Sequence, residues 1–184
     1  MTDDADRVYD RLLVLRSQAG DQVAFTEIVD RYQPRLRYYL RKMLFDVHAA
    51  EDVMQDVWCD VFRAMPRLAD AGAFRAWLYR IARDRAFRDL RKRRPRPRPV
   101  DELALAAHAA EIDKFKPEDV ELVHAALDKL APEHREALIL RFIDDMSYTE
   151  MAAIVGCQVG TVRSRLHYAK QALGEVLERM AIHD

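Results

Sequence analysis

The sequence contains little cysteine, glycine or proline and no long apolar run. Among its 184 residues there are two cysteines, five glycines and seven prolines. Cys59 and Cys157 lie far apart and have no partners at metal-binding or disulfide spacing, so the sequence supports neither a zinc knuckle nor a disulfide framework. We expect both cysteines to be small core residues. The low glycine and proline content also excludes collagen-like and low-complexity chains.

Features that direct a chain to a membrane are also missing. No apolar run approaches the ~18 residues that a membrane span needs. The first ten residues, MTDDADRVYD, have neither the basic nor the apolar region of a signal peptide. We therefore expect a soluble, cytoplasmic protein with no membrane insertion. The length allows one domain or two small ones and excludes a large multidomain enzyme.

Charge is segregated along the chain, although the net charge is only −1. Residues 74–98 carry 11 basic and 2 acidic groups, whereas residues 99–132 carry 3 and 8. Clustered Lys and Arg side chains neutralise phosphates, which is the usual sequence-independent source of affinity for nucleic acid. The basic segment therefore favours a contact with a polyanion. A solvated arginine face is the alternative for this segment taken alone.

Apolar residues recur with helical spacing along nearly the whole chain, and no stretch shows the alternation typical of a strand. We therefore expect an all-α protein of two small helical domains joined by a flexible linker. The first helix should place Val8, Leu12, Leu15 and Ala19 on one apolar face. Pro34 lacks a backbone donor and should divide the next helical segment in two. The helices expected in the first domain span residues 6–19, 22–32, 34–45, 49–65 and 73–93.

A proline-rich tract, R-P-R-P-R-P, must end the last of these helices, because each proline removes a donor and pushes its predecessor toward an extended conformation. We expect a first domain of residues 1–94, a linker of residues 95–116 and a second domain of residues 117–184. Within the linker, the alanine-rich acidic stretch 101–113 has the composition of a weak helix. The second domain should contain helices at 118–130 and 133–142, and a third that begins at Ser147.

The segment 147–167 has the pattern of two helices joined by a tight turn. Ser147 and Glu150 have the spacing of a capping box, and Gly156 lies at the turn. This spacing favours a helix-turn-helix, although a purely structural helical hairpin has the same pattern. Polar side chains should then face outward near the start of the second helix, where a recognition helix reaches base edges and phosphates. They are Gln158, Thr161, Arg163, Ser164 and His167.

Four blocks of sequence, in order along the chain, carry a family resemblance. They are Ala24-Phe25 with Tyr32, residues 50–58 (AEDVMQDVW), residues 74–83 (FRAWLYRIAR) and residues 147–167. At these spacings the chain resembles the extracytoplasmic-function (ECF) sigma factors, which direct bacterial core RNA polymerase to specific promoters and initiate transcription. The resemblance implies that the first domain is sigma domain two, that the linker replaces domain three, and that the second domain is sigma domain four.

The resemblance also implies which residues meet each protein partner and the upstream promoter element. Asp52, Gln55, Asp56 and Asp60 would dock on the β′ clamp of core RNA polymerase, although alone they look like the solvated face of an amphipathic helix. The β flap of polymerase and an anti-sigma factor are further implied partners. Contacts from domain four to the minus-thirty-five element of promoter DNA would come from Gln158, Thr161, Arg163, Ser164, Arg165, His167 and Lys170.

The helix at 73–93 would separate the promoter strands and read the minus-ten element. Trp77 faces the core by periodicity, while the resemblance leaves base stacking open for it. Asp84 stands where many relatives have Asn, and its carboxylate would repel phosphate and accept a hydrogen bond from cytosine. The implied minus-ten residues are Arg67, Phe74, Trp77, Arg80, Arg83, Asp84 and Arg88.

Two functions of other classes remain open. One is a one-component helix-turn-helix regulator whose first domain senses a ligand, and the other is a sigma-mimicking adaptor that binds an anti-sigma factor. Neither needs 11 basic groups in residues 74–98. For an enzyme, only His48 with Glu51, or Asp52 with Asp56, offer candidate groups, and such residues on one helix are more often a solvated face. We therefore expect no catalytic residue, no metal and no cofactor.

Overall fold

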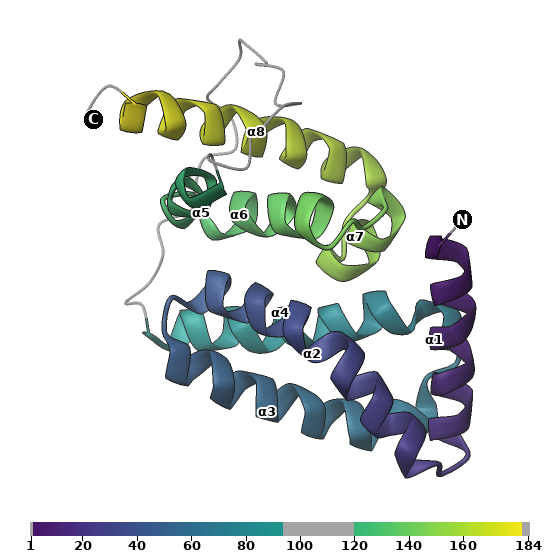
Figure 1. The fold of residues 1–184 in the computed structure, drawn as a ribbon. Coiled ribbons are helices and arrows are strands. Elements are labelled where there is room, and N and C mark those ends of the chain that lie inside the picture. Colours follow the sequence, from purple (N-terminus) through teal and green to yellow (C-terminus); the bar gives the residue numbers. More distant parts are fainter. Residues whose placement is uncertain (1, 94–119, 182–184) are drawn as a thin grey trace. The chain divides into compact units, whose positions relative to one another are not determined.

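The computed structural model describes residues 2–93 and 120–181. Within these ranges every regular element is a helix, which confirms the all-α fold. The helices form two compact units, one N-terminal and one C-terminal (Figure 1). The linker expected at 95–116 and the weak helix expected at 101–113 lie outside the part of the chain that is described.

In the N-terminal unit, α2, α3 and α4 run alongside one another and α1 lies at one end of them (Figure 1). Aspartates begin two of these helices: the Asp21 carboxylate accepts hydrogen bonds from the backbone of Val23 and Ala24, and the Asp46 carboxylate accepts one from Ala49. The elements are α1 (Thr2–Gln18), α2 (Gln22–Leu44), α3 (Val47–Ala64), the short 3-10 turns η1 (Met65–Arg67) and η2 (Ala71–Ala73), and α4 (Phe74–Arg93).

Pro34 does not divide the second helical segment, so the expectation of two helices there is wrong. Helix α2 runs without interruption from Gln22 to Leu44 with Pro34 inside it. A proline in a helix interior costs about 3 kcal/mol. Here α2 is fixed in the core on both sides of the proline, by Ile28 and Tyr32 before it and by Leu36, Tyr39 and Leu40 after it. Their burial outweighs the lost hydrogen bond.

The apolar face expected on the first helix exists, but it is not the face that packs. Val8, Leu12 and Leu15 are exposed to 67%, 48% and 51%, whereas Leu13 and Val14 are fully buried. Asp10 explains the orientation. Its carboxylate accepts hydrogen bonds from the Tyr32 hydroxyl at 2.5 Å and from Arg31 Nε at 2.9 Å, which turns the opposite side of α1 toward α2. Burial and this bond to Asp10 raise the pKa of Tyr32.

In the C-terminal unit, the long helix α8 packs on α5 and α6, and α7 precedes it in a helix-turn-helix (Figure 1). Ser147 and Glu150 form the expected capping box, and Gly156 ends α7 in the left-handed conformation with φ of 74°. The predicted helix-turn-helix is therefore present. The elements are α5 (Val120–Asp128), α6 (Pro132–Leu138), a π-helical turn η4 (Ile139–Ile143), α7 (Tyr148–Val155) and α8 (Val159–Ala181).

A buried arginine joins α6 to the end of α5. Arg135 is 2% exposed, and its Nε and Nη2 atoms donate to the backbone carbonyls of Leu127 at 2.9 Å and Leu130 at 2.6 Å. The last carbonyls of a helix have no partner within the helix. Arg135 therefore supplies a donor to the Leu130 carbonyl and a second donor to the Leu127 carbonyl, which also accepts from the Leu130 backbone amide at 3.1 Å.

We expected both cysteines to be core residues, but neither is fully buried. Cys59 is exposed and Cys157 is half-buried. On α3 the buried positions are Val53, Val57 and Val61, and Cys59 lies about 200° around the helix from Val57. The expectation is therefore wrong for Cys59.

Among the described residues no helix has the length and apolar character to cross a membrane, and no cluster of three potential metal ligands occurs.

Candidate nucleic-acid and protein interfaces

The acidic stripe of α3 consists of Asp52, Gln55, Asp56 and Asp60. Asp52, Gln55 and Asp56 are exposed, and Asp60 is half-buried. Three of the four side chains are carboxylates, so this face suits basic groups on a partner.

Arg85 of α4 binds two of these carboxylates. Its Nε and Nη2 atoms donate to Oδ2 of Asp60 at 2.8 and 2.5 Å, and its Nη1 atom donates to Oδ2 of Asp56 at 2.8 Å. The hydrogen bond to Asp60, with the charges of Asp60 and Asp56, raises the pKa of Arg85. Sequence reasoning did not single out Arg85. The available signal was the spacing of the two aspartates, which places them one turn apart on a helix that must pack against its neighbour.

Helix α4 presents a basic stripe to solvent. Arg80, Asp84 and Arg88 are exposed and follow one another at intervals of four residues, so Asp84 separates the two cations. Arg83 is half-buried, with its guanidinium 4.5 Å from the centroid of the Phe87 ring. This face of α4 suits a phosphate backbone, except at Asp84.

The aromatic residues at the start of α4 face inward to different degrees. Phe74 is 1% exposed and meets the Tyr32 ring edge to face at 5.4 Å between centroids. Trp77 is half-buried, 6.0 Å from Phe74 between ring centroids. Phe74 therefore belongs to the core, and part of the Trp77 ring is accessible.

The loop before α4 is fixed at both ends. Gln18 of α1 donates from Nε2 to the carbonyls of Met65 at 3.0 Å and Leu68 at 2.8 Å. The Asp70 carboxylate accepts from the Gly72 backbone at 2.8 Å. Arg67 lies exposed on this ordered loop.

The second helix of the helix-turn-helix shows its polar residues as expected. Gln158, Thr161, Arg163, Ser164 and His167 are all exposed. The remaining two candidates, Arg165 and Lys170, are half-buried. This end of α8 carries cations and hydrogen-bonding groups without an acidic side chain, a composition that suits the edge of a DNA groove.

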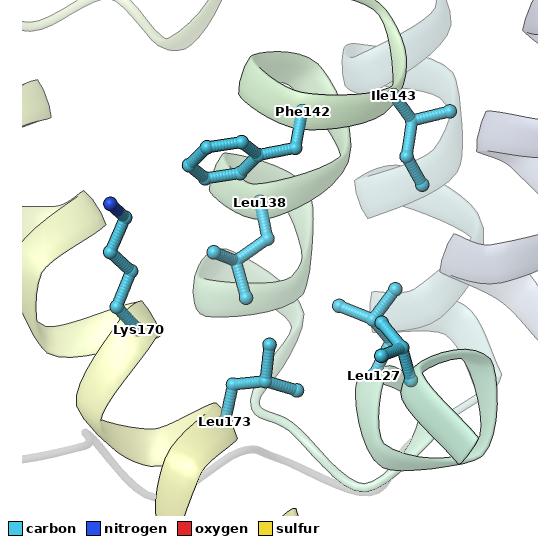
Figure 2. A pocket seen from close by; sticks show the side chains of 7 residues that line it. Leu127, Leu138, Phe142, Ile143, Lys170 and Leu173 are labelled. Carbon is cyan, nitrogen blue, oxygen red and sulfur yellow. The ribbon is translucent and has the colours of Figure 1, made fainter. Parts of the chain in front are cut away.

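The C-terminal unit also has an apolar pocket that sequence reasoning did not identify. Its volume is about 140 Å³. Figure 2 shows Leu127, Leu138, Leu173 and the Phe142 ring around the opening, with the Lys170 chain at one edge. The Lys170 ammonium lies 5.1 Å from the centroid of the Phe142 ring. The lining residues are Val123, Leu127, Leu138, Phe142, Ile143, Lys170 and Leu173.

The chain matches models of two regions of one protein family. Residues 28–96 match sigma-70 region 2, and residues 121–173 match sigma-70 region 4. Similar curated proteins include the RNA polymerase sigma-H factor of Pseudomonas aeruginosa, 34% identical, and the ECF RNA polymerase sigma-E factor of Escherichia coli strain K12, 33% identical. Each alignment covers 92% of this chain and 94% of the relative.

Two solved structures with a similar fold are complexes. CnrH with the cytosolic domain of CnrY matches with a TM-score of 0.71 and 28% identity, over 93% of this chain and 98% of CnrH. The sigma factor RpoE with the anti-sigma factor NepR from Bartonella quintana matches with a TM-score of 0.64 and 27% identity, over 84% of this chain and 96% of RpoE.

Proposed function

The chain belongs to the ECF sigma factors of RNA polymerase, and from this membership we propose how its residues divide the work of promoter recognition. An ECF sigma factor directs core polymerase to specific promoters and initiates transcription. We assign residues 1–94 to sigma domain two, residues 95–116 to the linker and residues 117–184 to sigma domain four. The chemistry of RNA synthesis belongs to polymerase, so the chain needs no enzymatic activity of its own. Its place of action is then the cytoplasm.

Polymerase docking is proposed at α3. Asp52, Gln55 and Asp56 are exposed and would meet basic side chains of the β′ clamp. Such charged contacts steer association and fix register more than they add affinity. Asp60 differs from these three because it is half-buried and accepts two hydrogen bonds from Arg85, whereas Asp56 accepts one.

Recognition and opening of the minus-ten element are proposed at α4 and the loop before it. Arg67, Arg80 and Arg88 are exposed and would follow the phosphates of the displaced strand, with Arg83 beside them. The accessible part of Trp77 would stack on a base, and the buried Phe74 would support it from the core. Asp84 would weaken phosphate contacts locally.

Domain four is proposed to read the minus-thirty-five element through the start of α8. Gln158, Thr161, Arg163, Ser164 and His167 would reach base edges and phosphates in the major groove. Arg165 and Lys170 are half-buried, so they would contribute through charge at the margin of the interface.

The apolar pocket of domain four is the proposed docking site for the β flap. Its lining is almost wholly aliphatic and aromatic, and such a pocket accepts the apolar face of a helix. An anti-sigma factor is a further proposed partner, because the similar sigma factor RpoE from Bartonella quintana was solved in complex with the anti-sigma factor NepR.

The joint presence of an acidic docking face on α3 and a helix-turn-helix in one chain carries this proposal. Run-off transcription with reconstituted core polymerase on genomic fragments, with start-site mapping, tests it. The expected result is core binding and initiation from a defined set of promoters. Tight duplex binding by the chain alone, without core binding or initiation, would favour the one-component regulator. Binding to an anti-sigma factor without initiation would favour the adaptor.

A further inference from the structure

An ion-paired cluster in the N-terminal unit joins the helix proposed to dock on polymerase to the helix proposed to open the promoter. The cluster consists of Arg85 on α4 with Asp56 and Asp60 on α3. We propose that Asp60 is not a polymerase contact. It is a positioning residue that acts through Arg85 and holds α4 where its basic stripe can separate the strands. This inference rests on the proposed function of the two helices.

The two aspartates are held in different ways. Asp60 accepts two hydrogen bonds from Arg85, and its Oδ1 atom lies 3.9 Å from Nη1 of Arg63. Asp56 accepts a single bond from Arg85, and its side chain is 61% exposed, against 31% for Asp60. The charge of Asp60 is therefore already matched within the protein. Asp56 retains an oxygen for an outside partner.

Helix α4 needs such a contact because its buried side chains beyond the first turns are small. Leu78 and Tyr79 are fully buried near its start, but the next core positions are Ala82 and Ala86. An alanine buries little apolar area and fixes the rotation of a helix poorly. A guanidinium fork on two carboxylates has defined geometry and fixes both the rotation and the register of α4 against α3. The exposed Arg80 and Arg88 lie on the same helix, so their position follows from this contact.

The test compares variants that break the cluster with a matched charge control on the same helix. Arg85→Gln and Asp60→Asn remove the pair. Arg91→Gln removes an equal charge from α4, but within the described residues the Arg91 Nε atom donates to the Phe87 carbonyl, at 3.2 Å, and not to a carboxylate. With holoenzyme on a duplex promoter, we expect Arg85→Gln and Asp60→Asn each to reduce the fraction of open promoter about tenfold. The reactivity of unpaired thymines measures this fraction. Core affinity should stay within about twofold for all three variants, and opening by Arg91→Gln should resemble the wild type.

Combined substitutions separate this role from general damage to the fold. The double variant Asp60→Asn with Arg85→Gln should open the promoter no less than either single variant, because the two substitutions remove the same interaction. Exchange of the charges, Asp60→Arg with Arg85→Asp, should recover part of the lost opening. A loss of core affinity in Asp60→Asn similar to that in Asp52→Lys would make Asp60 a polymerase contact and overturn the proposal. Equal opening by Arg85→Gln and Arg91→Gln would overturn it as well.

Hydrogen exchange of the free protein provides a readout that does not depend on polymerase. The amides of the second half of α4 should exchange faster in Arg85→Gln and Asp60→Asn than in Arg91→Gln. Unchanged exchange would overturn the positioning role even if the two variants open the promoter less than the wild type does. If the wild type opens no promoter, the proposed function fails, whereas the exchange result still decides whether the cluster positions α4.

Discussion

The guanidinium of Arg163 lies 5.8 Å from the centroid of the Tyr148 ring. The two residues come from the two helices of the helix-turn-helix, Tyr148 at the start of α7 and Arg163 in α8. Arg141 approaches the same ring, with its guanidinium 5.6 Å from the centroid. A cation over an exposed aromatic ring gains about 0.5–1 kcal/mol. Tyr148 therefore restrains Arg163 before any DNA is bound.

This restraint predicts an effect of Tyr148 on DNA affinity. Tyr148→Ala should weaken holoenzyme binding to the upstream duplex element about threefold, because Arg163 then loses its ordered position. Tyr148→Phe keeps the ring and should bind like the wild type. Fluorescence anisotropy with a labelled duplex measures both. In an Arg163→Ala background the effect of Tyr148→Ala should disappear, and an undiminished effect there would mean that Tyr148 acts in another way.

The exposed carboxylate of Asp52 tests polymerase docking. Asp52→Lys should change the free energy of unfolding by less than about 0.5 kcal/mol, because the side chain is exposed, yet it should weaken association with core polymerase. Asp56→Lys is a less specific probe because it also breaks the bond to Arg85. Asp30→Lys on α2 makes the same charge change at another exposed position and serves as the control. Equal core binding by Asp52→Lys and Asp30→Lys would show that Asp52 is a solvent-exposed residue without a role in polymerase binding.

The buried Arg135 predicts a large loss of stability in domain four. Arg135→Met keeps much of the apolar stem but leaves the carbonyls of Leu127 and Leu130 without these donors. The expected cost is about 3 kcal/mol in the free energy of unfolding, measured by chemical denaturation. The exposed Arg179→Met should change this free energy by less than about 0.5 kcal/mol. Similar values for the two variants would contradict a stabilising role for Arg135.

The Asp21 cap predicts a dependence of stability on pH. The backbone hydrogen bond from Ala24, and next the bond from Arg16, hold the pKa of Asp21 below its usual value of 3.8. Because the pKa is lowered by folding, the stabilisation is complete above the unfolded pKa and is lost as the pH falls through the folded pKa. Asp21→Ala should therefore be less stable than the wild type at pH 7, and the difference should shrink below pH 3.8. A difference that does not change with pH would show that the charge of Asp21 is unimportant.

The helical elements were largely predictable because their signals are local. Ser147, Glu150 and Gly156 specify the start and end of α7 through hydrogen bonds and a backbone conformation within a few residues, and the structure has them as expected. The outward face of α8 follows from helical periodicity alone, so the exposure of Gln158 and Arg163 was predictable too.

Features that depend on tertiary contacts were not predictable from local pattern. Pro34 stays within α2 because core contacts on both sides of it hold the helix. Leu12 lies on the apolar face of α1, but Asp10 binds Tyr32 and selects the opposite face for packing. Arg85 looked like one more cation of a basic helix, and only the packing of α4 against α3 shows its two carboxylate partners.

The two DNA-reading elements predict different defects when their arginines are removed. Arg163 is exposed on α8, which should meet duplex DNA, whereas Arg80 and Arg88 are exposed on α4, which should act after the strands part. Arg163→Ala should cost about 1–3 kcal/mol of upstream binding if Arg163 makes a bidentate base contact, and should change the preference at one position. Arg80→Ala with Arg88→Ala should reduce open-complex formation and weaken its salt dependence, because phosphate contacts are lost.

A template with a pre-melted bubble over the minus-ten region distinguishes the two defects. The bubble removes the cost of unpairing, so it should restore much of the activity of the Arg80 and Arg88 double variant. It leaves the upstream duplex unchanged, so it should restore none of the binding lost in Arg163→Ala. Abortive initiation assays on matched duplex and bubble templates measure both. Equal recovery of the two variants, or of neither, would mean that α4 and α8 act at steps other than those assigned to them.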